Sequence, residues 1–428
     1  MNMDLIRDRM LAFKHNEDGV GFSKIRSEAI DLFEQVGIPT SRNEEWKYTR
    51  LGGLFQSPFT FPEMSMEVIE YSANYLPGHD TANIIVFVDG VYSSVQSKVT
   101  SKGLQIMSLE EGHKKYPSFV EAHLGDSQRY IQDGIIALNT ALIHGGVFIF
   151  AEKGKLIDKP LYIYHLVGCQ RNNMLSQPRS LVHIAPGAQL QIVETYVSIG
   201  QKESLTNEVM EVIVEEGALF DYVKIQHDAV HANHLGTTYI RQIGKSVVHT
   251  VNLTFQGKLV RNNIQIIMEA MHSEAYLYGL YVQDDKMHVD NHTVVDNRVP
   301  NCYSNELYKG VLTGHSTGVF NGKIFVREDA QKINAFQSNK NILLSETATI
   351  NTKPQLEIYA DDVKCSHGCT VGRLDEEGLF YLQSRGVSEG VAKALMLHSF
   401  MMDVLEQIKD VELREYIDQL IVNKLHLS

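Results

Sequence analysis

Hydrophobic positions recur at helical spacing near the N-terminus. Ile25, Ala29 and Phe33 repeat every four residues, as the buried stripe of an amphipathic helix does. Gly37, followed closely by a proline, would end this helix. The segment 44–49 (EEWKYT) is polar but holds the one tryptophan of the chain, so we expect another element to pack against that ring.

A second helical pattern appears after Gly386. A helix capped by Ser388 would have an inward face formed by Val391, Leu395, Met401 or Met402, Leu405 and Ile408, and Asp410 can cap a final helix. We therefore expect helical regions at both ends of the chain. Such regions could cover the ends or a flank of the structure that lies between them.

Between about residue 160 and residue 386, short alternating strands separated by turns replace the helical spacing. A turn, a small residue and a strand recur, with the small residue at positions 188, 218, 246, 275, 318 and 348. The steps are 30, 28, 29, 43 and 30 residues, and we interpret the step of 43 as one turn with an insertion. Such a repeat without helices is typical of a β-solenoid. A β-sandwich is the alternative, but a steady period is not expected of it.

These patterns divide the chain into three parts. Residues 1–155 are expected to form an N-terminal helical or mixed region, 156–385 a β core, and 386–428 a C-terminal helical domain. The expected fold class is therefore mainly β, with a solenoid flanked by α-helical regions.

The amino-acid composition argues against some classes of protein and of binding partner. The 428 residues include 39 Lys+Arg and 52 Asp+Glu, and the resulting net charge of −13 argues against binding to nucleic acid. Four cysteines in this length exclude a disulfide scaffold. The first residues lack the apolar core of a signal peptide, and we expect no membrane span. The sequence thus predicts a cytoplasmic protein whose cysteines are thiols or metal ligands.

Two short motifs suggest enzymes, and their context argues against both. Residues 314–318 (GHSTG) match the nucleophile elbow of serine hydrolases, with Ser316 as the nucleophile. That elbow needs a helix after the serine, whereas residues 319–326 are typical of a strand, so a polar turn is favoured and the hydrolase is the alternative. Residues 318–323 (GVFNGK) are one residue too short between their glycines for a phosphate loop. We expect no catalysis and no ATP site on this chain.

The strongest local signal for chemistry lies at residues 365–369 (CSHGC). In an extended strand Cys365, His367 and Cys369 share one face, about 6.8 Å apart per pair. Thiolate and imidazole bind iron, zinc or an iron–sulfur cluster, so these three residues form a tentative metal site. A closed zinc site needs a fourth ligand, which a second chain could supply. Packing of two small residues around a hydrogen-bonded histidine is the alternative.

Several longer segments carry a resemblance to a known family. They are residues 44–49 (EEWKYT), 307–310 (LYKG), 318–324 (GVFNGKI), 330–332 (AQK), 353–368 (KPQLEIYADDVKCSHG) and 379–386 (LFYLQSRG). In these segments the chain resembles the SufB/SufD family of iron–sulfur cluster assembly proteins, and within it the SufD type. The segments are long and specific, whereas residues 160–290 follow the family by pattern only.

The resemblance implies a right-handed parallel β-helix flanked by helical regions. It also implies a complex with a SufB-like paralogue and a SufC-type ATPase, which residues 388–425 would contact. The paralogues are expected to pair through the ends of their β-helices, near the strand that holds Cys365 and His367. An unpaired edge could also support a homodimer when the chain is alone.

The resemblance further implies roles for individual residues. His367 matches the histidine placed at the subunit interface, and Cys365 matches a cysteine common in SufD members. Cys369 lies where many members have a small residue, so it is either a third ligand or packing. We expect no intrinsic cofactor, with iron or a nascent iron–sulfur cluster at the interface between SufB and SufD. The hypothesis is a scaffold subunit, and its alternatives are a hydrolase at Ser316 and a purely structural partner of SufB.

Overall fold

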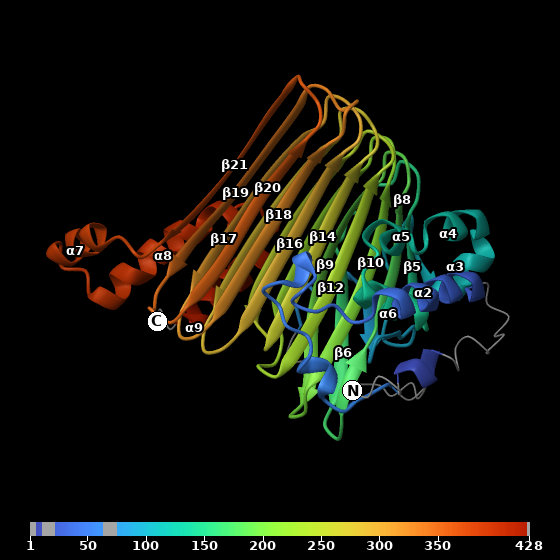
Figure 1. Cartoon of the computed structure of the whole chain (residues 1–428), viewed down its shortest axis with the longest axis horizontal. Helices are drawn as coiled ribbons and strands as arrows, with labels where there is room; N and C mark the ends of the chain where they lie inside the picture. Colours follow the sequence, from blue (N-terminus) through green and yellow to red (C-terminus); the bar gives the residue numbers. More distant parts are fainter. Residues whose placement is uncertain (1–5, 11–21, 63–74, 426–428) are drawn as a thin grey trace.

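Two long sheets of mainly parallel strands face each other in the computed structural model, which describes residues 6–10, 22–62 and 75–425 (Figure 1). Successive strands of the repeat alternate between the two sheets, so each turn of the chain adds one strand to each sheet. The result is a parallel β-helix of about 8 turns, and 44% of the described residues lie in strands and 23% in helices. The mainly β class and the solenoid expected from the sequence are confirmed.

Sheet A contains 11 strands and sheet B contains 10. The strands of sheet A are β1 (Phe59–Thr60), β4 (Leu104–Ser108), β5 (Val147–Ala151), β7 (Asn173–Ser176), β8 (Arg179–Ile184), β10 (Ser204–Val214), β12 (Ala232–Gln242), β14 (Leu259–Met268), β16 (His288–Asn297), β18 (Thr317–Val326) and β20 (Thr349–Ile358). The strands of sheet B are β2 (Asn83–Val88), β3 (Val91–Tyr92), β6 (Leu161–Cys169), β9 (Gln189–Gly200), β11 (Leu219–His227), β13 (Val247–Gln256), β15 (Glu274–Gln283), β17 (Tyr303–Leu312), β19 (Ile333–Leu343) and β21 (Val363–Gly372).

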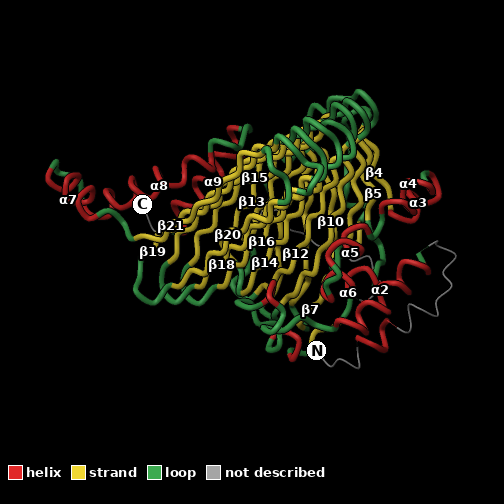
Figure 2. Tube along the Cα trace, turned by 45° about the horizontal axis from the view of Figure 1, so that its top comes forward, coloured by secondary structure: helices red, strands yellow, loops and turns green. Residues whose placement is uncertain are grey.

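The strand register confirms the repeat near 30 residues and corrects one part of it. Paired positions along sheet B are 190, 220, 248, 275, 304, 335 and 365, so successive turns differ by 27 to 31 residues. The step of 43 residues is not an insertion, because Ala275 lies on β15 of sheet B and Gly318 on β18 of sheet A. The loops gather along the two long rims of the stacked strands (Figure 2).

Apolar side chains from the inner faces of both sheets form the central core. Ile192 of sheet B and Val212, Ile240 and Ile266 of sheet A are fully buried there. Every residue of β10 is buried, because elements cover both faces of this strand. The sandwich alternative is excluded, since consecutive strands cross from one sheet to the other in a parallel stack.

The N-terminal helices cover the outer face of sheet A (Figure 1). Helix α2 (Ser23–Val36) ends directly before Gly37, as predicted, and it buries Ala29 and Phe33 against α6 (Gly134–Ala141). Between them lie the short 3-10 helices η1 (Glu44–Trp46) and η2 (Leu54–Gln56), and the helices α3 (Leu109–Lys115), α4 (Pro117–His123) and α5 (Asp126–Ile131).

A buried ion pair fastens these helices to sheet A. Arg179 on β8 donates to Glu211 on β10 at 2.6 Å, and neither side chain is exposed. Arg179 also donates to Asn139 of α6 at 3.2 Å. Glu211 accepts the backbone N–H groups of Gly125 and Ser127 at 2.9 and 2.8 Å, at the start of α5. Two helices and two strands therefore depend on one pair of opposite charges.

The C-terminal helices pack along the outer face of sheet B. They are α8 (Glu389–Leu405) and α9 (Val411–Lys424), whereas α7 (Glu376–Ser384) contacts α8 and buries none of its residues. Leu397, Met401 and Ile417 join Val251 and Leu280 in one apolar cluster. These helices therefore cover a flank of the solenoid and not its end, and no helix in the described ranges is long and apolar enough to span a lipid bilayer.

Two details of the C-terminal region differ from the expectation. Val391 and Leu395, which helical spacing places inward, are 51% and 52% exposed. Met401, Leu405 and Ile408 of the same predicted stripe are buried against sheet B, so the prediction is confirmed for them and wrong for Val391 and Leu395. Helix α7 begins at Glu376 within the part expected to be β core. The strands β2, β4 and β5 lie before residue 156 and belong to the two sheets, and the two boundaries between the three parts stay a prediction.

The last turn of the solenoid is uncovered. It consists of β20 and β21, the edge strands of sheets A and B, which we call the open end. Strand β20 pairs only with β18, and β21 pairs only with β19. No other described strand pairs with the free edge of either strand. Most of β21 is exposed. Figure 1 shows both strands at the end of the stack opposite to α2 and α6.

We predict that Glu211→Gln destabilises the protein, because it leaves the Arg179 guanidinium buried without a counter-charge. Removing one partner of a buried ion pair costs about 3–5 kcal/mol. Urea denaturation would measure the loss in free energy of unfolding. The control is Glu328→Gln on an exposed loop, with an expected change within about 0.5 kcal/mol. Equal stability of both variants would contradict the fastening role.

Candidate functional site

The residues Cys365, His367 and Cys369 lie on the inner face of β21, at the open end. Their register partners on β19 are Ala335, Gln337 and Asn339, all of which are buried. The alternation of β19 therefore carries over to β21, and the three side chains share one face as the spacing predicts. No further turn covers them, so His367 and Cys369 are exposed and Cys365 is half-buried.

Among the described residues, this row of potential ligands does not form a complete metal site. The ligand atoms of Cys365, His367 and Cys369 are not all within 4.8 Å of one another. Partial burial raises the pKa of the Cys365 thiol, so the thiol form dominates until a metal displaces its proton. The arrangement can offer sulfur and nitrogen ligands to an ion that a second chain also binds.

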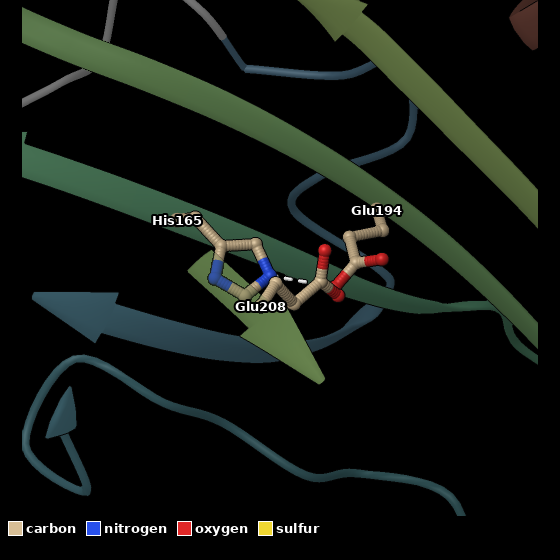
Figure 3. A group of neighbouring side chains, drawn as sticks. All are labelled: His165, Glu194 and Glu208. Carbon is tan, nitrogen blue, oxygen red and sulfur yellow. Dashed lines mark hydrogen bonds and ion pairs between the residues drawn. The ribbon is translucent and has the colours of Figure 1, made fainter. Parts of the chain in front are cut away.

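A second group of potential ligands lies deep inside the solenoid. Among the described residues, His165, Glu194 and Glu208 offer ligand atoms that all lie within 4.8 Å of one another (Figure 3). They come from β6, β9 and β10, and Lys224 on β11 lies beside them. All four side chains are at most 2% exposed. We call these four residues the charge cluster.

Opposite charges compensate each other within the charge cluster. His165 Nε2 lies 2.6 Å from Glu194 Oε1, and Lys224 Nζ donates to Glu208 Oε2 at 2.7 Å. Burial alone would raise the pKa of Glu194, but His165 and Lys224 lower it to about 2. Tyr196 also donates to Glu208 at 2.5 Å. A metal ion would have to displace the Lys224 ammonium, so the geometry favours an internal ion-pair network over a metal site.

Sequence reasoning did not find the charge cluster. Its members are charged residues in strands whose neighbours are apolar, which is a weak signal when read one strand at a time. The register connects it to the open end, because Glu194, Lys224, Asn252, Gly279, Tyr308, Asn339 and Cys369 occupy one column of sheet B. One inner column of the solenoid thus runs from the charge cluster to the last cysteine.

The hydrolase and phosphate-loop motifs do not form the sites that they suggest. Ser316 is fully buried, and its Oγ donates to the backbone oxygen of Thr313 at 2.7 Å. Strand β18 follows it where the elbow needs a helix. The segment 318–323 lies inside the same strand and forms no loop that could cradle a phosphate.

The segment 44–49 is a strap across the outer face of sheet A. Trp46 is buried, and the Arg261 guanidinium lies 3.7 Å from its ring centroid, which confirms that another element packs on this ring. Glu45 contacts His292 on β16 at 3.4 Å and Lys323 on β18 at 3.3 Å. The hydrogen bond from His292 helps to lower the pKa of Glu45 to about 2. Glu44 also pairs with Lys353 on β20, so the strap connects four turns and reaches the edge strand of sheet A.

Comparison with known proteins gives matches over nearly the whole chain. Residues 167–400 match the family model described as SUF system FeS cluster assembly, SufBD core domain. Residues 4–163 match the model described as SufBD protein N-terminal region. Together these models cover both the strap and the strand that holds Cys365 and His367.

Individual relatives agree with the family models. The iron–sulfur cluster assembly protein SufD of Escherichia coli is 27% identical over 402 residues, which cover 94% of this chain and 92% of that protein. An iron–sulfur cluster assembly SufBD family protein of Synechocystis is 28% identical over 408 residues, 92% of this chain and 88% of that protein. Protein ABCI7, chloroplastic, of Arabidopsis thaliana is 31% identical over 275 residues, 62% of this chain and 58% of that protein.

We predict that Lys224→Met lowers the free energy of unfolding by about 3–5 kcal/mol, because the Glu208 carboxylate then stays buried without its cation. The double variant Lys224→Met with Glu208→Leu should recover most of this loss, since it removes both charges. Chemical denaturation of the three proteins would measure both effects. A single variant as stable as the parent would show that the pair does not hold the interior together.

Proposed function

The chain belongs to the SufBD family of iron–sulfur cluster assembly proteins, and on that premise we propose that it is a scaffold subunit of the SUF assembly complex. In this proposal it pairs with a SufB-like paralogue and a SufC-type ATPase and supports iron entry and cluster formation. The observation that carries the proposal is the uncovered last turn, which presents Cys365 and His367 on an inner face that all earlier turns keep buried.

The open end supports pairing with another β-helix. The free edges of β20 and β21 present backbone groups that can accept further strands. A SufB-like paralogue with an equivalent end would continue both sheets and would enclose the row of ligands. In the absence of that paralogue, a second copy of this chain could occupy the same edges and form a homodimer.

The proposed cargo at this interface is iron or a nascent iron–sulfur cluster. A thiolate from Cys365 and an imidazole from His367 suit iron, and Cys369 is a tentative third ligand on the same face. Because these ligand atoms do not close a site within one chain, the paralogue would supply the remaining ligands. Ligands divided between two chains would let the cargo leave when the chains move apart.

The C-terminal helices support contact with the ATPase. Phe380, Tyr381, Val391 and Leu395 are 72%, 58%, 51% and 52% exposed, and we call them the apolar patch. They lie on two helices, α7 and α8, that contact each other, and exposed apolar groups that gather on one surface mark protein interaction sites. Helix α8 joins sheet B through Asp403, whose carboxylate lies 2.5 Å from Lys309 Nζ on β17. ATP-driven movement of the partner would reach the solenoid through this connection.

The proposed site of action is the cytoplasm. All four cysteines are free thiols, which fits a reducing compartment. A purely structural partnership with the paralogue is the second candidate, in which the row at Cys365 and His367 only packs. It differs from the scaffold proposal in predicting that both residues can be replaced without loss of assembly.

We expect His367→Ala to lower the iron and sulfide content of the anaerobically co-expressed complex by on the order of tenfold, because loss of a ligand weakens metal binding. The variant should leave the stability of this chain unchanged, since His367 is exposed. Lys364→Ala is the matched control on the outer face of the same strand. Full iron content in both His367→Ala and Cys365→Ala would favour the purely structural partnership.

We expect Phe380→Asp to weaken co-purification of the ATPase, because a charge in the apolar patch would be desolvated on contact. Val95→Asp is the control, since Val95 is 74% exposed at a site far along the chain from α7 and α8. Pull-down from the co-expressed complex would compare the two variants. Retention of the ATPase by Phe380→Asp would place the contact elsewhere.

A further inference from the structure

A buried carboxyl group lies behind the open end. Glu306 is on the inner face of β17, two strands before β21, and is 2% exposed. Its register neighbours are Leu277 on β15 and Gln337 on β19. Neither of these side chains can carry a charge that would balance an ionised carboxylate.

Gln337 connects Glu306 to the open end. Its amide Nε2 donates to Glu306 Oε2 at 2.7 Å, and its register partner on β21 is His367. Side chains that share a face on neighbouring strands lie about 4.8 Å apart. A Cβ atom at Gly322 would come within 2.2 Å of the Gln337 amide, so the glycine opposite provides the space that this side chain occupies. Glu306, Gln337 and His367 form one continuous row.

The row contains acceptor oxygens without donors. Glu306 Oε1 and Gln337 Oε1 are buried and have no hydrogen-bond partner among the described residues. Burial raises the pKa of Glu306 to about 7, against the opposing effects of Thr293 and Gln337. The other titratable group next to it is Tyr308, whose pKa burial and Glu306 both raise. Glu306 therefore lies among neutral groups, unlike Glu208, which is paired with the Lys224 ammonium.

We propose that Glu306 is the charge-compensating carboxyl group of the open end, protonated while Cys365 and His367 are empty and ionised when they bind a divalent metal ion. The inference deepens the proposed function and rests on it. When a metal ion with charge +2 binds, the Glu306 carboxyl group releases one proton to solvent and keeps the negative charge. No bond other than this O–H bond breaks at Glu306, and no electron is transferred.

The distance between Glu306 and the bound metal ion sets how strongly the carboxylate raises metal affinity. Two strand spacings separate Glu306 from His367, or about 10 Å. At that distance the attraction of a divalent ion for one carboxylate, with a dielectric between that of protein and water, changes affinity on the order of tenfold. Glu306 raises metal affinity only at pH values at which its carboxyl group can ionise. Metal affinity should therefore rise with pH across neutrality by more than the ligands alone require.

Anaerobic Co2+ titration of the full-length chain at pH 6 and pH 8 tests this. We expect the affinity ratio between pH 8 and pH 6 to be on the order of tenfold larger in the wild type than in Glu306→Gln. Glu357→Gln on β20 removes a partly exposed carboxylate from the same end and should keep the wild-type ratio. Equal ratios in wild type and Glu306→Gln, with binding that His367→Ala abolishes, would overturn the role of Glu306 and leave the proposed function intact.

Absence of Co2+ binding by the wild type would overturn both the metal-binding end and the compensating role. Thermal unfolding tests the carboxyl group without metal. Because folding keeps Glu306 protonated up to about pH 7, the wild type loses stability as pH rises above the ordinary pKa of 4.5 towards 7. The melting temperature of Glu306→Gln relative to wild type should therefore increase from pH 5 to pH 7.5. A difference that is constant with pH would show that Glu306 does not titrate, which also overturns the inference.

Discussion

The structure depends on one constraint of parallel strands, which is that each turn can satisfy its backbone groups only against the turns beside it. From β8 to β19 every strand has neighbours in the same sheet on both sides, and whole strands such as β10 are buried. The constraint fails at the last turn, where β20 and β21 have one neighbour each. The inner face that is core elsewhere becomes a surface there, and that surface contains the potential ligands.

The buried glutamates inside the solenoid fall into two groups, which differ in their partners. Glu208 and Glu211 each have a Lys or Arg cation within 2.7 Å, and Glu194 lies 2.6 Å from His165, so these carboxylates have strong polar partners that contribute to the fold. Glu306 has only an amide donor, so its charge state can respond to what binds nearby. Glutamates thus stabilise the interior and also provide a group near the open end whose charge can change. The hydrogen-bond or ion-pair partner of each glutamate decides which of these it does.

Much of this could be predicted from the sequence because the relevant signals are local. The period near 30 residues and the common face of Cys365, His367 and Cys369 follow from strand alternation alone. The inward placement of Val391 failed because helical spacing does not say which face of α8 meets sheet B. The charge cluster and Glu306 were missed because their partners are 16 to 31 residues away and on other strands, where only register brings them together.

The position of the C-terminal helices has a mechanical consequence. Helices α8 and α9 pack on β13, β15 and β17 of sheet B. On sheet A, the strap reaches β20, where Glu44 pairs with Lys353. The strap therefore supports sheet A up to its edge strand, whereas β21 extends beyond the strands of sheet B on which α8 and α9 pack. A load applied at α8 would bend sheet B against a stiffer sheet A, and the displacement would be greatest at the edge where Cys365 and His367 lie.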